Sequence, residues 1–295
     1  MSDQTYQFDM DAPVTESPQR VVSLVPSVTE SLFDLGLGDR LVAVTDYCVY
    51  PADGVAGLPR VGGTKNPDVQ QIIKLAPDLV IMNVEENREA DAEVLREAGI
   101  PVWVTFPKTV SEAINLLWNI MHTFDEPVMV PRVRLIEQTM DWVAGVSKAR
   151  EDNPTRVFVP IWLDPLMTFN ADTYSHDLLW VCGGLNVFAD RDRRYPLKAD
   201  LGVAEPYTGA QVEGRDTRYP RITLDEVVEA QPDVILLLTE PFQFTDEHIP
   251  MFADLDIPAA RDGRIHVVDG SLVTWHGTRL AHALNSIPAL LVPGM

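Results

Sequence analysis

The chain has 295 residues, of which 46% are hydrophobic and 23% charged, a composition typical of a globular protein with room for about two domains. Its formal net charge is -21 at pH 7, with a pI near 4.5. This acidic balance argues against a nucleic-acid binder and against docking on an anionic membrane. No stretch approaches the roughly 20 apolar residues of a membrane-spanning helix, so we expect no membrane insertion.

The N-terminal stretch, residues 1–13, is acidic and polar and has neither the basic start nor the apolar core of a secretory signal. As written, the chain is therefore expected to be cytoplasmic; the alternative is an extracytoplasmic or periplasmic protein whose signal was removed. Cys48 and Cys182 fall in different halves, so we expect two free thiols in a reducing compartment. We also expect a monomer.

After an arm over residues 1–18, apolar strands alternate with helices at short spacing, which is typical of a parallel sheet. Strands are expected at 20–25, 41–45, 79–83 and 101–105, and helices near 28–36, 67–76, 88–98 and 110–123. Ser27, followed by Glu30 three residues later, predicts a capping box at the start of the first helix. Gly36 and Gly38 are expected to end that helix.

The connection to the second half covers residues 127–153. Apolar residues recur there at steps of three and four, which predicts one amphipathic helix: Val130, Val133, Ile136, Met140, Val143 and Val146. A single stiff helix as the only bridge predicts small lobe motions rather than wide closure.

The second half repeats the alternation of strands and helices. Strands are expected near 156–162, 186–189, 233–239 and 265–268, and helices near 174–183, 223–231 and 277–291. Residues 190–221 form a long irregular segment rich in Arg, Tyr, Pro and Gly. A loop of this length in a compact domain is usually functional or disordered.

The two halves also repeat one design. Asn66–Met82 reads as a helix, a Pro-Asp break and an apolar strand, and Thr223–Leu238 repeats it. We therefore predict an α/β fold of two Rossmann-like lobes with parallel sheets, joined by one long backbone helix, with a ligand cleft between the lobes. The predicted domains are an N-terminal lobe at 1–126, a connecting helix at 127–153 and a C-terminal lobe at 154–295.

Several runs follow one another along nearly the whole chain: Arg20–Glu30 (RVVSLVPSVTE), Asp46–Pro51 (DYCVYP), Pro77–Ile81 (PDLVI), Val181–Phe188 (VCGGLNVF) and the repeat Pro232-Asp233. Together they resemble class III periplasmic-binding-protein-like proteins, the helical-backbone type that delivers cobalamin, haem and ferric siderophores to ABC importers. The similarity is greatest to the cobalamin-binding branch. The resemblance implies a substrate-binding protein for a metal chelate or tetrapyrrole-like ligand, not an enzyme, with no cofactor required. Its partner is expected to be an ABC permease; the alternative is a carrier that handles the ligand inside the cell.

The sequence departs from the family pattern in places. Transported members carry an acidic residue at the tip of each lobe for docking on the permease, and these places hold Gln70 and Asp225 here, so one docking charge is missing. The disulfide that the cobalamin-binding pattern makes to the last helix has no second cysteine. Aromatic residues expected over a corrin align with Thr64 and Asn83, and only Tyr219 keeps an aromatic ring.

Ligands of such folds bind beyond the carboxyl ends of the strands. The candidate ligand-binding residues there are Ser27, Asp46, Tyr47, Cys48, Lys65, Asn66, Glu85, Glu86, Asn87, Trp162, Phe169, Arg218, Tyr219, Phe242, Trp275 and His276. The many aromatic residues suit a large, flat ligand held by stacking. Alternatively, some of them, Trp162 and Phe242 in particular, pack within their own lobe.

The irregular segment concentrates arginine in an otherwise acidic chain: Arg191, Arg193, Arg194, Arg215, Arg218 and Arg221. Guanidinium groups bind carboxylates and phosphates in bidentate fashion, which favours an anionic chelate. The alternative is ion pairing with neighbouring acids: Asp190, Asp192, Asp200, Glu205, Glu213 and Asp216.

A bare metal ion is a further hypothesis. Cys48 and His276, together with Glu85 or Glu86, could bind zinc or iron, or His276 could be the axial ligand of a metal already held in a macrocycle. The plainer interpretation is a half-buried cysteine and a histidine that caps a helix. An enzyme is the weakest alternative, because the sequence contains neither a nucleophile elbow nor a phosphate-binding loop.

Overall fold

The computed structural model describes residues 12–149 and 152–292. Within these ranges, contacts divide the chain into two compact units. Unit 1 holds the described residues of Met1–Pro107, Ser111–Gln138 and Trp275–Leu280, and unit 2 those of Lys108–Val110, Thr139–Thr274 and Ala281–Met295. Residues 275–280 therefore group with the N-terminal part of the chain. The domain bounds given above stay a prediction.

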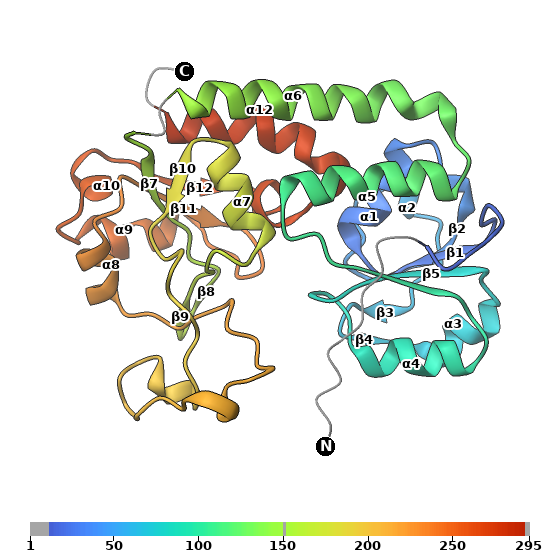
Figure 1. The fold of residues 1–295 in the computed structure, drawn as a ribbon, viewed down its shortest axis with the longest axis horizontal. Coiled ribbons are helices and arrows are strands. Elements are labelled where there is room, and N and C mark those ends of the chain that lie inside the picture. The colour runs from blue at the N-terminus through green and yellow to red at the C-terminus, as the bar shows by residue number, and fades with distance from the viewer. Residues whose placement is uncertain (1–11, 150–151, 293–295) are drawn as a thin grey trace. The chain divides into compact units, whose positions relative to one another are not determined.

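Unit 1 is built on a parallel sheet with the strand order β2-β1-β5-β6 (Figure 1). Its strands are β1 (Val21–Ser23), β2 (Leu41–Val44), β5 (Leu79–Asn83) and β6 (Val102–Thr105). The helices are α1 (Pro26–Asp34), α2 (Ala52–Val55), α3 (Val69–Leu75), α4 (Glu89–Glu97) and most of α5 (Val110–Thr123). A short antiparallel pair, β3 (Gly62–Gly63) and β4 (Asn66–Pro67), precedes α3.

Unit 2 has a second parallel sheet, with the order β10-β7-β11-β12. Its strands are β7 (Thr155–Phe158), β10 (Gly184–Asn186), β11 (Val234–Leu238) and β12 (Ile265–Val268), and β8 (Trp162–Leu163) pairs with β9 (Leu166–Met167). The helices are α7 (Tyr174–Val181), α8 (Leu224–Ala230), α9 (Ile249–Ala253), α10 (Pro258–Arg261), α11 (Ser271–Thr274) and α12 (Leu280–Leu291). The long helix α6 (Val130–Lys148) contributes residues to both units.

The two sheets have the same topology, which confirms the predicted α/β fold with two parallel sheets and a long helix. β1, β2, β5 and β6 correspond in order to β7, β10, β11 and β12. The helices α3 and α8 end alike, because Ala76 and Gln231 both adopt the left-handed conformation, at φ 46° and φ 44°. Each is followed by Pro-Asp and the strand that pairs with the first strand of its sheet.

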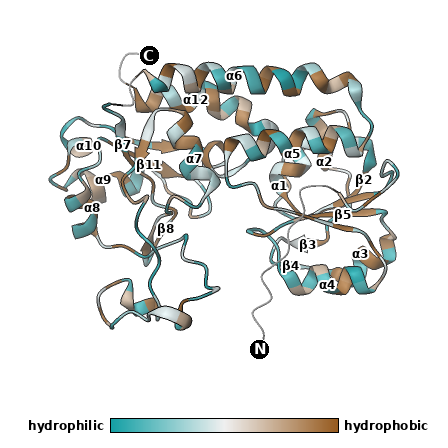
Figure 2. Cartoon of the chain, in the orientation of Figure 1, coloured by the Kyte–Doolittle hydropathy of each residue, from teal (hydrophilic) through white to brown (hydrophobic). Residues whose placement is uncertain are grey.

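Each sheet carries its own hydrophobic core. All residues of β5 and β11 are buried, as expected for central strands with helices on both faces. The strands are accordingly brown in Figure 2, whereas the helices alternate between brown and teal faces. Burial on both faces explains why these strands read as unbroken apolar runs.

The capping box predicted at Ser27 and Glu30 is wrong. α1 begins one residue earlier, at Pro26, and its N-cap is Val25, which has no side-chain oxygen to cap the helix. Proline suits the first turn because its missing N–H would have no partner there. Glu30 instead forms an ion pair of 3.0 Å with Arg279. Ser27 Oγ lies 3.5 Å from His276 Nε2.

Cys48 and Cys182 are both buried and free, which confirms the prediction of two free thiols. Among the described residues, no helix is both long and apolar enough to cross a membrane.

Candidate functional site

The candidate residues of unit 1 lie where the strands of its sheet end. Asp46 and Tyr47 lie in the loop after β2, and Tyr47 is 63% exposed. Glu85 and Asn87 follow β5, and Lys65 lies in the turn between β3 and β4. A sheet of parallel strands collects these loops at one edge, which is where ligands of α/β proteins bind.

Two of these rim loops are tied together by Asn87, which is buried. Its Nδ2 donates hydrogen bonds to the carbonyl oxygens of Leu24 (3.2 Å) and Thr64 (3.0 Å), and its Oδ1 accepts the N–H of Asn83 at 2.8 Å. Lys65 Nζ donates to the carbonyl oxygen of Glu85. Asn87 therefore positions the rim through its side-chain hydrogen bonds. Asn66 and Glu85 are exposed, and Glu86 is half-buried.

Residues 275–279 bring an aromatic group to the same unit. Trp275 packs edge-on against Tyr50, with ring centroids 5.9 Å apart. The Arg279 guanidinium carbon lies 4.5 Å from the centre of the Tyr50 ring and 5.5 Å from that of Trp275. Trp275 is buried but Tyr50 is 41% exposed, so Tyr50 is the ring that is open to a ligand. Sequence reasoning missed Tyr50 and Arg279, although Tyr50 lies inside the family-like run Asp46–Pro51.

His276 is 7% exposed. Burial lowers the pKa of its imidazole from 6.5 to about 4, so the side chain is neutral at physiological pH. A neutral imidazole is the form that ligates metals. His276 is also the N-cap residue of the single turn Gly277–Arg279, but its side chain makes no capping hydrogen bond.

The other candidate metal ligand, Cys48, is fully buried. Its Sγ lies 3.1 Å from both Thr29 Oγ1 and Thr45 Oγ1. Burial raises the pKa of the thiol despite these hydrogen bonds, so the thiolate that a metal needs is disfavoured. Within residues 12–149 and 152–292, no group of three or more His, Cys, Asp and Glu side chains is placed to hold a metal ion. The metal pair Cys48 and His276 stays a prediction.

In unit 2, the candidate aromatic residues lie beyond the end of β7. Trp162, in β8, is 43% exposed and packs edge-on against Phe242 at a centroid distance of 5.6 Å. Phe242 in turn packs on Phe244 and His248. Phe169 is only 2% exposed and thus belongs to the core of its unit. Trp162 is therefore the large aromatic surface on this rim.

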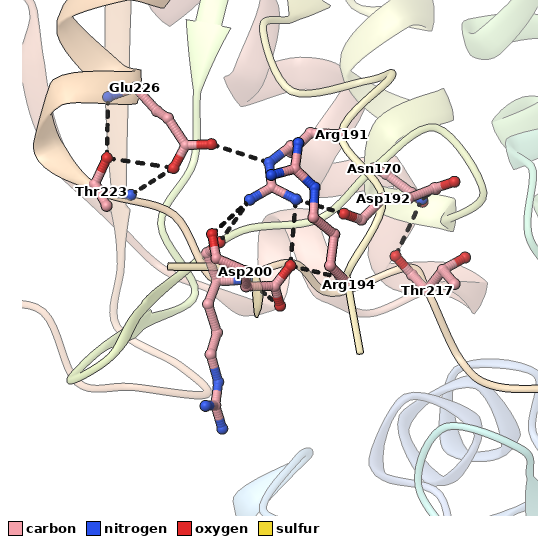
Figure 3. Close-up of polar contacts among 9 residues, drawn as sticks. Asn170, Arg191, Asp192, Arg194, Asp200, Thr217, Thr223 and Glu226 are labelled. Carbon is pink, nitrogen blue, oxygen red and sulfur yellow. Dashed lines mark hydrogen bonds and ion pairs between the residues drawn. The ribbon is translucent and has the colours of Figure 1, made fainter. Parts of the chain in front are cut away.

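The arginine-rich segment is held by a buried ionic network (Figure 3). Arg191 forms ion pairs with Asp200 (3.2 Å) and Glu226 (3.0 Å), and Asp200 also accepts the backbone N–H groups of Arg194 and Arg221. The Asp200 side chain is completely buried. For Arg191, the ion-pairing alternative is thus confirmed, and this residue anchors the segment.

Three arginines of the segment gather on tyrosine rings. The guanidinium carbons of Arg193 and Arg215 lie 5.6 Å and 4.9 Å from the centre of the Tyr195 ring. Arg218 stacks over Tyr219 at 5.3 Å and pairs with Asp216 at 2.8 Å. We call Arg193, Tyr195, Arg215, Asp216, Arg218 and Tyr219 the arginine–tyrosine cluster.

Asp216 is the acidic member of this cluster. Burial by itself raises the pKa of its carboxyl group, but hydrogen bonds from Arg218 and the charges of Arg218 and Arg193 outweigh burial and lower the pKa. The carboxylate therefore remains ionised and neutralises one of the three guanidinium groups.

Comparison with known proteins decides the family. Residues 21–270 match the family described as periplasmic binding protein. The chain belongs to this family. Membership of a family of binding proteins confirms the expectation of a substrate-binding protein rather than an enzyme.

This binding protein is 25% identical over 272 residues to the vitamin B12-binding protein of Vibrio parahaemolyticus, covering 92% of the chain and 88% of the relative. Its fold matches the crystal structure of the periplasmic vitamin B12-binding protein of Vibrio cholerae, with a TM-score of 0.72, 21% identity, and coverage of 94% and 98% of the two chains. A periplasmic haem-binding protein from Pseudomonas aeruginosa matches with the same TM-score of 0.72 and 21% identity, over 94% of each chain.

A structure titled as a vitamin B12-binding protein and one titled as a haem-binding protein match its fold with the same TM-score. Tyr47, Tyr50 and Trp162 stay candidates for ligand contact because their rings are exposed beyond the strand ends.

Proposed function

We propose that the protein binds a tetrapyrrole-like metal chelate, of the class that includes cobalamin and haem, through aromatic side chains that lie beyond the strand ends of its sheets. The observation that carries this proposal is the exposure of large aromatic rings beyond the strand ends: Tyr47, Tyr50 and Trp162. Exposed aromatic groups of this size are costly in water and supply flat surfaces for stacking on a macrocycle. The names of the relatives support the same ligand class.

The unit 1 rim also supplies a polar anchor. Arg279 is held between Glu30, at 3.0 Å, and the Tyr50 ring, so its guanidinium is fixed before any ligand arrives. Fixed side chains lose little conformational entropy on binding, which favours tight association. Ser27 and His276, adjacent to this pair, complete the proposed unit 1 contacts.

A matched pair of tryptophans tests the proposal. Trp162 and Trp180 belong to the same unit and are 43% and 44% exposed, but Trp180 lies on α7 and not on the rim. We expect Trp162→Ala to weaken binding of ferric protoporphyrin or cyanocobalamin by about tenfold or more, because a central aromatic contact is lost. Trp180→Ala should leave the affinity unchanged. Equal effects of the two substitutions would contradict the proposed site.

We further propose that an ABC permease receives the ligand. Gln70 on α3 and Asp225 on α8 are both exposed and occupy equivalent helices of the two sheets. With one acid instead of two, docking would depend on Asp225, so Asp225→Lys should abolish association with the permease without changing ligand affinity.

A permease partner also implies that the protein works on the outer side of the membrane. Relatives with solved structures are named as periplasmic proteins, and an import permease accepts ligand from the outer side of the membrane. Cell fractionation of the native host tests this point. Recovery of the chain from the cytosol alone would overturn the permease proposal and favour the intracellular carrier predicted from the sequence.

A further inference from the structure

The arginine–tyrosine cluster contains three guanidinium groups but only one carboxylate. Of its three guanidinium groups, only that of Arg218 forms an ion pair with the carboxylate of the cluster, Asp216. Among the described residues, Arg193 and Arg215 form no ion pair, although both stack on Tyr195. In a chain with a net charge of -21, two such arginines on one ring are unexpected.

Arg193 also holds a donor that has no acceptor. Its Nε is buried and, within the part of the chain that the structure describes, makes no hydrogen bond. A buried donor without a partner is unfavourable, so it usually marks a place where a water, an ion or a ligand completes the site.

The cluster is fixed in place by the backbone around it. The N–H of Arg193 donates to the carbonyl oxygen of Thr217 at 2.8 Å, and the N–H of Asn170 donates to that of Arg218, also at 2.8 Å. Tyr195 OH donates to the carbonyl oxygen of Asp216 at 2.8 Å. The Arg191 network beside it secures the same segment (Figure 3). The guanidinium groups are thus presented by an ordered frame.

Stacked guanidinium groups that lack a carboxylate are suited to bind one from outside. Their planar N–H forks match carboxylate oxygens in bidentate geometry, and such charge-assisted bonds are about twice as strong as neutral ones. The cluster includes Arg218 and Tyr219, two of the candidate ligand-binding residues predicted from the sequence. A ligand held by these two residues would lie beside Arg193 and Arg215.

We propose that Arg193 and Arg215 bind ionised carboxylate groups of the ligand and thereby select carboxylate-bearing tetrapyrroles, such as haem, over cobalamin, whose corrin side chains are amides. This inference rests on the proposed function and narrows it. Relatives of both kinds share the fold, so family membership leaves this choice open.

The test compares ferric protoporphyrin IX with its dimethyl ester, in which both carboxylates are blocked, under identical detergent conditions. We expect the wild-type protein to bind the free acid at least about tenfold more tightly than the ester, a difference of about 1.4 kcal/mol. Arg193→Gln and Arg215→Gln should each bring the two affinities to within a few-fold, whereas Arg193→Lys should retain part of the preference because it keeps the charge.

Arg261→Gln is the matched control, because Arg261 is an exposed arginine of the same unit that pairs with Asp256 on the surface. It removes the same charge and should leave the preference intact. Arg215 is exposed, so its variant keeps the test valid even if Arg193→Gln does not fold.

The outcomes separate the two proposals. Equal binding of acid and ester by the wild-type protein would overturn the carboxylate inference and leave the proposed function standing. Binding of cyanocobalamin that weakens in Arg193→Gln would also overturn it, because the phosphodiester of that ligand would then be the bound anion. Failure of all three compounds to bind would refute the proposed function itself, and the inference with it.

Discussion

Asp233 and Arg156 exchange two hydrogen bonds across unit 2: Asp233 Oδ2 accepts the backbone N–H of Arg156 at 2.9 Å, and the N–H of Asp233 donates to the carbonyl oxygen of Arg156 at 2.8 Å. Asp78 and Arg20 repeat this exchange in unit 1, with both distances 2.9 Å. Each arginine also donates to a carbonyl oxygen at the end of the helix that precedes the Pro-Asp pair, α3 for Arg20 and α8 for Arg156. The aspartate of each Pro-Asp pair and the arginine that bonds to it therefore link the end of a helix to the start of the first strand of each sheet.

These hydrogen bonds predict that replacing the two aspartates lowers the free energy of unfolding by different amounts. Asp233→Ala removes the acceptor of one backbone N–H, whereas Asp78→Ala removes the acceptor of two, those of Gln19 and Arg20. Each lost bond to a carboxylate costs about 1–3 kcal/mol, so both variants should be destabilised, Asp78→Ala more strongly. Urea unfolding measures the difference. The exposed residue Asp254 provides the control, since Asp254→Ala should change stability little.

Gly277 is predicted to tolerate no side chain. Its φ is +79°, and a Cβ built there would lie 2.2 Å from Ser31 Oγ. Alanine would strain the backbone and push α1 away from the turn, disturbing the hydrogen bond of 3.0 Å from the N–H of Thr278 to Ser31 Oγ. We expect Gly277→Ala to cost at least about 2 kcal/mol in thermal or urea unfolding. Gly57→Ala, with no atom within 4 Å, should cost little, and similar losses at both sites would refute the argument.

His276 predicts a pH dependence of stability. Because burial lowers its pKa to about 4 in the folded protein, the unfolded chain binds this proton first as the pH falls below about 6.5. The free energy of unfolding should therefore drop between pH 6.5 and pH 4, with His276 contributing about 2 kcal/mol between pH 7 and pH 5.

The variant His276→Asn isolates this contribution. Between pH 7 and pH 5, the free energy of unfolding of this variant should fall by about 2 kcal/mol less than that of the wild type, which is the contribution assigned to His276. The control His122→Asn removes an exposed histidine of α5 and should follow the wild-type curve. If the free energy of unfolding of His276→Asn depended on pH as it does in the wild type, His276 would take up its proton equally well in the folded and the unfolded protein, and the argument would be wrong.

Arg191 is predicted to keep residues 195–219 ordered. Arg191→Gln leaves the fully buried Asp200 carboxylate without its guanidinium partner, and breaking such a buried pair typically costs about 3–5 kcal/mol. Limited proteolysis should then cut the segment much faster than in the wild type. Arg261→Gln disrupts only an exposed pair, which contributes little, and its cleavage rate should not change.

Much of the fold could be predicted from the sequence, because central strands such as β5 and β11 are continuous apolar runs and each follows the same Pro-Asp break. Local signals failed where a tertiary contact competes. Ser27 has the pattern of an N-cap, but Pro26 starts the helix and the Ser27 hydroxyl lies near His276, far away in the sequence.

The candidate site was predictable only as a set of loops. The run Asp46–Pro51 pointed to the rim of unit 1, yet nothing local indicates that Arg279 stacks on Tyr50. Likewise, composition suggested an arginine patch but could not separate Arg191, which pairs with Asp200 and Glu226, from Arg193, which forms no ion pair among the described residues. That distinction depends on which acids the folded chain brings close, and no spacing rule encodes it.

Titration of the purified protein with ferric protoporphyrin and with cyanocobalamin, followed by absorbance and tryptophan fluorescence, tests the central claim most directly. We expect saturable binding of at least one of the two with a Kd of about 1 μM or tighter, weakened in Trp162→Ala and unchanged in Trp180→Ala. Absence of saturable binding to both compounds by the folded protein would contradict the claim that this chain is a tetrapyrrole-binding protein.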